Sequence, residues 1–148
     1  MAFRFALAPL LRLRQSLERQ HALALERASF ELARARERLA QLDRFLADSA
    51  RTDAASLAAG RTAAEVQFAG LVGQQLGQFR IQLTEEVGRL EALRQQAAER
   101  YQQAYREREV LESLRLRHRR AYELDQMRRQ QKELDAAYLL QRWHKQGG

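Results

Sequence analysis

Apolar residues recur at alternating steps of three and four positions along two stretches of this chain. One stretch runs back from Leu46, and the other runs forward from Leu76. An apolar residue about every 3.5 positions predicts a helix whose apolar seam winds left-handed around a partner helix. The two seams mirror each other about a point near residue 61. Facing residues are then expected to be Leu46 with Leu76, Leu39 with Leu83, Leu32 with Leu90, Leu25 with Ala97, Leu10 with Leu111, and Leu7 with Leu114.

The expected fold is therefore all-α: a long two-helix antiparallel coiled-coil hairpin with a C-terminal helical overhang. Pro9 is tolerated in a first helical turn, which places helix one at about 8–55. Gly60 suits a left-handed cap, and Thr62 to Glu65 has the T-x-x-E form of a capping box. We expect the turn at about 56–62 and helix two at about 63–142, all within one domain spanning 1–148.

The two predicted helices differ in length, which leaves part of helix two without a partner. Helix one is exhausted opposite about Leu116, so Arg117 to Trp143 are expected to form the overhang. A lone helix of this length is only marginally stable in water. Within helix one, Leu17, His21 and Leu25 give two successive steps of four, which predicts a stutter that locally unwinds the supercoil.

Composition argues against an enzyme. The chain has 148 residues, with one proline, 7% aromatic residues and 30% charged residues. A sequence with so few aromatic and so many charged residues has little from which to build a spherical core. A rod of two helices has no closed pocket that excludes water. Its three histidines are scattered, it has no cysteine, and it carries no glycine-rich phosphate loop. We therefore expect no catalytic residue, cofactor or metal, and the apolar segment 5–11 is too short to span a bilayer.

The positive charge is concentrated near the two chain ends. The net charge is +7, with +3 in residues 1–50, zero in 51–100 and +4 in 101–148. A hairpin brings both basic segments to its open end, where they suit an acidic protein partner. Nucleic-acid phosphates are an alternative partner for the arginines of 115–120, but acidic residues interrupt this cluster and no aromatic stacking platform accompanies it.

Apolar residues are unusually dense near the predicted turn. Phe68, Val72, Leu76 and Phe79 follow one another at steps of four, four and three. They fit either the core of the seam or a docking surface. The second interpretation arises because too many large apolar residues occur here for all of them to face inward: Phe30, Phe45, Phe68, Leu71 and Ile81. An exposed apolar stripe usually marks a docking surface.

Two short motifs at the chain ends resemble those of the flagellar FliJ family. The opening reads Phe3-Arg4-Phe5-Ala6-Leu7, followed by Pro9-Leu10-Leu11-Arg12-Leu13-Arg14 and Glu18, and is similar to an F-x-F-x-L lead before an L-x-x-R helix. The segment Arg128-Arg129-Gln130-Gln131-Lys132-Glu133-Leu134-Asp135 resembles a closing Q-K-x-L-D signature. Together with the length and the turn position, they make the likeness extend over nearly the whole chain.

This resemblance implies a cytoplasmic, non-enzymatic component of the flagellar type III export apparatus, peripheral at the cytoplasmic face of the cell membrane and similar to the central stalk of rotary ATPases. The implied partners are the hexameric export ATPase (FliI), the export gate protein (FlhA) and export chaperones, with no nucleic acid and only indirect contact with the membrane. The implied gate contact falls on Val72, Leu76, Phe79 and Leu83. We expect the ATPase-ring contact at Arg4, Arg12, Arg14, Arg115, Arg117, Arg119 and Arg120.

Three other functions fit the same pattern. One is the equivalent stalk protein of a virulence-type secretion system, which would share the hairpin and the ring partner. The chain also fits a basic nucleic-acid-binding coiled coil or a dimerising scaffold, because an antiparallel seam can form within one chain or between two.

Overall fold

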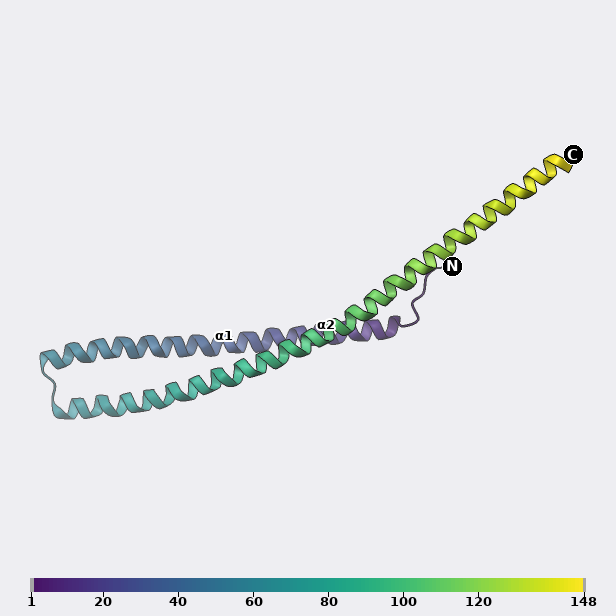
Figure 1. Ribbon diagram of the computed structural model, residues 1–148. Coiled ribbons are helices and arrows are strands. Elements are labelled where there is room, and N and C mark those ends of the chain that lie inside the picture. The colour runs from purple at the N-terminus through teal and green to yellow at the C-terminus, as the bar shows by residue number, and fades with distance from the viewer. Residues whose placement is uncertain (1, 148) are drawn as a thin grey trace. The chain divides into compact units, whose positions relative to one another are not determined.

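The structure consists of two helices joined by a short turn. The computed structural model describes residues 2–147, with α1 at Ala8–Ala59 and α2 at Ala63–Gly147 (Figure 1). The two helices pack against each other and residues 2–147 contain no strand, which confirms the all-α helical hairpin. The chain divides into two compact units: unit 1 comprises Met1–Glu18 with Gln103–Gly148, and unit 2 comprises Arg19–Gln102.

The turn in unit 2 uses the residues that the sequence indicated. Gly60 has a φ of 90°, a left-handed conformation that only glycine adopts at little cost, so it ends α1. The amide of Glu65 donates to Thr62 Oγ1 at 3.2 Å, and the Thr62 amide donates to Glu65 Oε2 at 3.3 Å. This reciprocal pair confirms the predicted capping box.

The first helix continues past the end expected near residue 55. Just before that point, Thr52 donates its hydroxyl to the carbonyl of Asp48 at 3.0 Å, four residues earlier. Its side chain therefore bonds back within the helix and does not compete with the helical backbone. The helix ends only at Ala59, where Gly60 reverses the backbone.

The core of unit 2 lies in the middle of the paired segments. Leu32, Ala35, Val87 and Leu90 form one buried cluster, with Leu39 packed against it. These residues hold the positions that the mirror-related seams predicted for them. Ion pairs flank the cluster across the two helices, from Arg36 to Glu91 at 3.0 Å and from Arg80 to Asp43 at 2.6 Å.

The core of unit 1 corrects the predicted pairing near the chain ends. Leu10 and Leu7 were expected to face Leu111 and Leu114, but each is 37% exposed. Leu11 and Phe5 are instead buried with Leu111, and Phe3, Ala8 and Leu114 pack against this cluster. The prediction failed because it followed leucines and assumed a stutter at Leu17.

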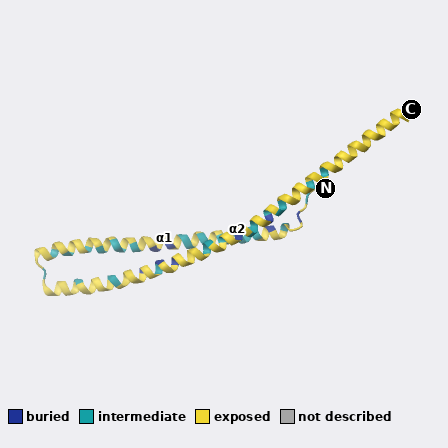
Figure 2. Ribbon diagram, in the orientation of Figure 1, coloured by how far each residue is buried: buried dark blue, intermediate teal, exposed yellow. Residues whose placement is uncertain are grey.

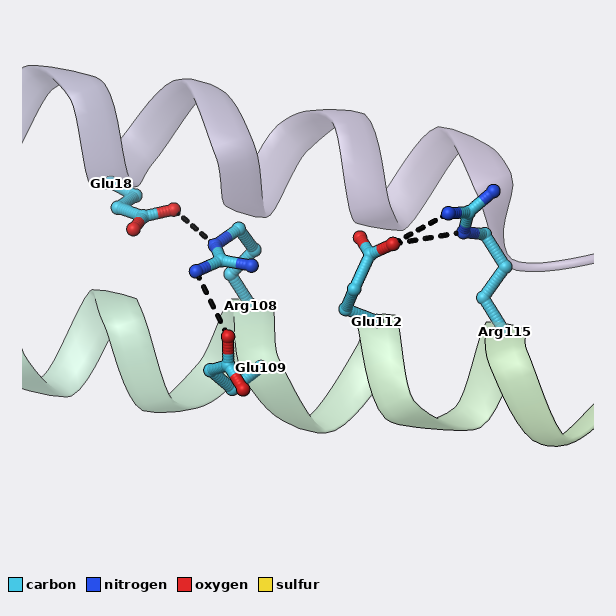
Figure 3. Close-up of polar contacts among 5 residues, drawn as sticks. All are labelled: Glu18, Arg108, Glu109, Glu112 and Arg115. Carbon is cyan, nitrogen blue, oxygen red and sulfur yellow. Dashed lines mark hydrogen bonds and ion pairs between the residues drawn. The ribbon is translucent and has the colours of Figure 1, made fainter.

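The regular seam in fact passes through charged residues. In α1 the seam positions that belong to unit 1 are 11, 14 and 18. The alternating steps of three and four then continue through positions 21, 25, 28, 32 and 35. The Glu18 and Arg108 side chains are only 17% and 19% exposed and form an ion pair with each other, and Arg108 also binds Glu109 at 3.1 Å (Figure 3). The bond with Glu18 raises the pKa of the Arg108 guanidinium. No stutter is needed once these polar positions are counted.

The residues before α1 shorten the expected overhang. The Phe5 ring meets His118 edge-on at 5.6 Å, and the Phe3 ring lies 5.6 Å from Tyr122. Extended chain advances about 3.3 Å per residue against 1.5 Å in a helix, so two residues of this lead cover about four residues of α2. His118 and Tyr122 therefore have intramolecular partners, contrary to the expectation that the overhang begins at Arg117.

Beyond Tyr122, α2 remains helical but is almost entirely exposed. Gln126 is partly covered, and every other residue from 123 to 147 is exposed (Figure 2). This segment is the C-terminal overhang of the hairpin. It carries apolar side chains that nothing in unit 1 covers, including Leu134 and Trp143, which are 66% and 70% exposed.

Gly60 and Gly70 have different backbone conformations, so substituting alanine for each should have opposite effects on stability. Gly60→Ala should lower the free energy of unfolding by about 1 kcal/mol, because a left-handed conformation is strained for alanine. Gly70→Ala should raise it by about 1 kcal/mol, because Gly70 lies inside α2 and an added Cβ meets nothing within 4 Å. Urea unfolding followed by circular dichroism measures both, and shifts of equal sign would contradict the assigned turn.

The ion pair in the unit 1 seam predicts a rescue. Arg108→Leu should destabilise the chain by about 1–3 kcal/mol, because it leaves the mostly covered Glu18 carboxylate without its guanidinium. Adding Glu18→Leu should restore most of this loss, since two apolar side chains then meet in the seam. Urea unfolding followed by circular dichroism measures both variants. If the double variant is no more stable than Arg108→Leu, the pairing of Glu18 with Arg108 is refuted.

Candidate partner-binding surfaces

An apolar groove lies between α1 and α2 in unit 2, near the turn. It has a volume of about 360 Å³. The residues that line it are Phe45, Leu46, Ser49, Ala50, Asp53, Arg61, Phe68, Ala69, Val72, Gly73 and Leu76. Its seam positions are occupied by short side chains, namely Ser49, Asp53, Ala69 and Gly73, which do not fill the space between the helices as leucines do.

Large apolar side chains border this groove and face solvent. Phe68 is 70% exposed and Phe45 is 55% exposed. The interpretation of Phe68 and Phe79 as seam core is therefore wrong, and the expected surplus of exposed apolar residues is found: Phe30, Phe45, Phe68, Leu71 and Ile81 are all at least half exposed. Phe45 and Phe68 both line the groove, and exposed apolar side chains gathered at a groove are typical of a protein interaction site.

Ion pairs fix the helices around the groove. Arg61 binds Asp53 at 3.3 Å, with its side chain only 18% exposed, and both residues line the groove near the turn. Asp43 and Arg80 bridge α1 and α2 further from the turn through two hydrogen bonds, of 2.6 and 3.4 Å. The hydrogen bond from Arg80 lowers the pKa of the Asp43 carboxyl. The groove thus has charged contacts on both sides and an apolar interior.

The four residues expected at a gate contact lie in different environments. Val72 and Leu76 line the groove, and Val72 is 39% exposed. Phe79 is 49% exposed, one helical turn beyond Leu76. Leu83 is only 6% exposed and packs inside the hairpin, so a partner would reach it only if the helices separated.

A basic surface occupies unit 1. This unit carries 14 Arg and Lys residues against eight Asp and Glu, whereas unit 2 carries 12 against 11. All seven arginines expected at an ATPase-ring contact belong to unit 1. Arg4 stands between Phe3 and Phe5, whose contacts with Tyr122 and His118 bring it to the part of α2 that carries Arg117, Arg119 and Arg120.

Three of the seven arginines are ion-paired, and five are exposed. Arg14 binds Glu107 of α2 at 2.5 Å, Arg115 binds Glu112 at 2.6 Å, and Arg119 binds Glu123 at 3.3 Å (Figure 3 shows the Arg115 pair). The exposed group consists of Arg4, Arg12, Arg117, Arg119 and Arg120. The exposed group is the one available to an acidic partner at low desolvation cost.

Residues 2–147 contain no cluster of three or more His, Asp or Glu side chains that could hold a metal ion. Neither helix in the described range has an apolar stretch long enough to cross a bilayer.

Sequence reasoning found only part of the α1 side of the groove. It counted Phe45 in the surplus of apolar residues and placed Leu46 in the seam opposite Leu76, but it did not identify Ala50, which lines the same groove from α1. The short side chains at seam positions 49, 53, 69 and 73 were the available signal, because a seam without large apolar residues leaves a gap between its helices.

Comparison with known proteins identifies the family. The family model for the flagellar FliJ protein matches residues 3–148. Searches of the curated proteins and of the solved structures each found no match. The match includes both the Phe3–Phe5 lead that packs on α2 and the overhang that follows Tyr122. Because it extends over essentially the whole sequence, this chain belongs to the flagellar FliJ protein family.

Proposed function

We propose that this chain is a non-enzymatic, central-stalk-like component of the flagellar protein export apparatus. In this role unit 1 contacts the hexameric export ATPase, and the groove of unit 2 docks on the export gate protein. The observation that carries the proposal is the separation of two chemically different surfaces into two units, one basic and one apolar. Membership of a non-enzymatic flagellar family supports it.

Electrostatics favours an acidic ring as the partner of unit 1. Five exposed arginines, Arg4, Arg12, Arg117, Arg119 and Arg120, lie in a unit with a net charge of +6. A surface of this charge attracts an acidic partner over a distance comparable to the Debye length, about 8 Å at physiological salt. The exposed overhang would lose its solvent contact on entering a ring and gain order there.

The groove suits a partner that inserts apolar side chains. Its walls come from both helices, so a bound segment would fill the space that short seam residues leave between them. We assign the gate contact to Val72, Leu76 and Phe79, and we omit Leu83 because it is buried. The proposal also includes escort of export chaperones and a cytoplasmic location peripheral to the membrane, both of which rest on family membership.

Charge reversal tests the ring contact. Arg117→Glu with Arg120→Glu should weaken binding to the purified export ATPase by about tenfold or more and reduce the dependence of the dissociation constant on salt. Arg38→Glu with Arg51→Glu changes the net charge equally on exposed residues of unit 2 and should leave affinity nearly unchanged. Titration at two salt concentrations measures both. Equal losses in the two variants would reject a local contact.

Apolar truncation tests the gate contact. Phe79→Ser should weaken binding to the cytoplasmic domain of the gate protein by about tenfold or more, because a buried aromatic contact is lost. Ile81→Ser is a matched control. Ile81 is also an exposed apolar residue, at 58%, but it lies about 200° round α2 from Phe79, on nearly the opposite face. Circular dichroism should show unchanged helicity in both. If Phe79→Ser binds as well as the unmodified chain, the assignment of Phe79 to the gate contact fails.

A further inference from the structure

The overhang carries a second apolar stripe that is distinct from the hairpin seam. Leu124, Met127, Leu134 and Tyr138 are 54%, 65%, 66% and 63% exposed. With Gln131 they follow steps of three, four, three and four, and at 100° per residue they fall within an arc of about 80°. This is the spacing of a coiled-coil seam, with an apolar residue at four of its five positions.

The hairpin does not cover this stripe. Phe3 packs on Tyr122, which is the last seam residue of α2 to have an aromatic partner from the N-terminal lead. Leu124 lies two residues further on and therefore about 200° round the helix, on nearly the opposite face. The stripe also has clear limits, because its preceding positions hold Arg117 and Arg120 and its next position after Tyr138 holds Gln141.

The charges beside the stripe indicate what covers it. Arg128 and Asp135 follow Met127 and Leu134 directly, so both lie along the same edge, seven residues apart. Gln131 donates to Asp135 Oδ1 at 3.1 Å, which holds that carboxylate beside the stripe. When two copies of this helix pair antiparallel, Gln131 of one copy faces Leu134 of the other. In the same alignment Met127 faces Tyr138, and Leu124 faces Gln141.

This alignment places opposite charges together twice. Arg128 of one chain meets the partner's Asp135, and the twofold axis repeats the pair in the other direction. Along the other edge, Glu123 meets the partner's His144. The ion pairs already present on this helix, Arg119 with Glu123 and Asp125 with Arg129, hold their charges along the same helix and leave Arg128 outside them.

A stripe on another face does not offer the same complementarity. Tyr122, Ala136, Leu140 and Trp143 share one side of the overhang, but Arg129 and Glu133 occupy the positions between Tyr122 and Ala136. Charges in the middle of a seam would have to lose their hydration on pairing. The stripe from Leu124 to Tyr138 is therefore the one suited to a helical partner.

We propose that the overhang is a self-association surface, through which two copies of this chain pair as an antiparallel coiled coil along Leu124, Met127, Leu134 and Tyr138. The pair contains about six side-chain layers, fewer than a stable obligate dimer has, so association is weak and depends on protein concentration. Self-pairing and entry into the ATPase ring would use the same overhang, so one chain cannot do both at once, but the test of self-pairing contains this chain alone and does not depend on the proposed function.

The first test measures the molar mass of the full chain by sedimentation over a wide concentration range. The unmodified chain should shift from monomer to dimer as concentration rises. Leu134→Gln should raise the dissociation constant by about tenfold or more, because two buried leucines are lost from each dimer. Leu139→Gln is the control, since Leu139 is 61% exposed but lies off the stripe, and it should dimerise like the unmodified chain.

The second test uses charge exchange to define the alignment. Arg128→Asp alone and Asp135→Arg alone should each weaken dimerisation, because each places like charges together twice. A mixture of these two variants should associate, since every pair is then attractive, and the doubly exchanged chain should regain the original affinity. Circular dichroism checks that helicity is retained.

Three results would overturn the proposal. One is an unmodified chain that remains monomeric at every concentration. Another is a dimer that Leu134→Gln and Leu139→Gln weaken equally, or that neither substitution weakens. The last is a mixture of Arg128→Asp and Asp135→Arg that associates no better than either variant alone, which would exclude the antiparallel alignment.

Discussion

Packing in both units depends on one repeating contact between α1 and α2, in which positions at steps of three and four meet along a seam. Where leucines fill the seam, as at Leu32 and Leu90, the side chains are almost completely buried. Where the seam carries charge, as at Glu18 and Arg108, an ion pair substitutes for apolar contact. A polar layer costs stability relative to an apolar one but favours a single alignment of the helices, because a shifted register would leave both charges without partners.

The surfaces available to partners are the places where this seam is incomplete. Near the turn, Ala69 and Gly73 hold seam positions and are too small to close the space between the helices, which leaves the groove. Within residues 2–147, the part of α2 after Tyr122 is almost entirely uncovered, so its apolar residues remain exposed. In both places the apolar surface that would stabilise a hairpin is left for another molecule to cover. The basic charge of unit 1 adds an electrostatic attraction that unit 2, with a net charge of only +1, lacks.

Local sequence signals predicted the elements well because each acts within a few residues. Gly60 ends α1 through its own backbone conformation, and Thr62 with Glu65 begins α2 through two hydrogen bonds inside one turn of helix. The pairing of Leu32 with Leu90 was predictable because leucines occupy the seam on both sides. Near the chain ends this rule failed, since Leu10 and Leu7 lie beside the seam while Glu18 lies in it. Apolar periodicity alone cannot detect a seam position whose side chain is charged.

The sequence by itself determined the fold class, the turn and the separation of charge, because periodicity, capping residues and composition act locally or additively along the chain. It also carried the family, through motifs at both ends. Only the tertiary structure decided which face of each helix is covered. That outcome depends on residues more than 80 positions apart, such as Phe3 on Tyr122, Phe5 on His118 and Glu18 on Arg108. Whether a particular phenylalanine or arginine is buried or available to a partner follows from these distant contacts, and no local pattern in the sequence specifies them.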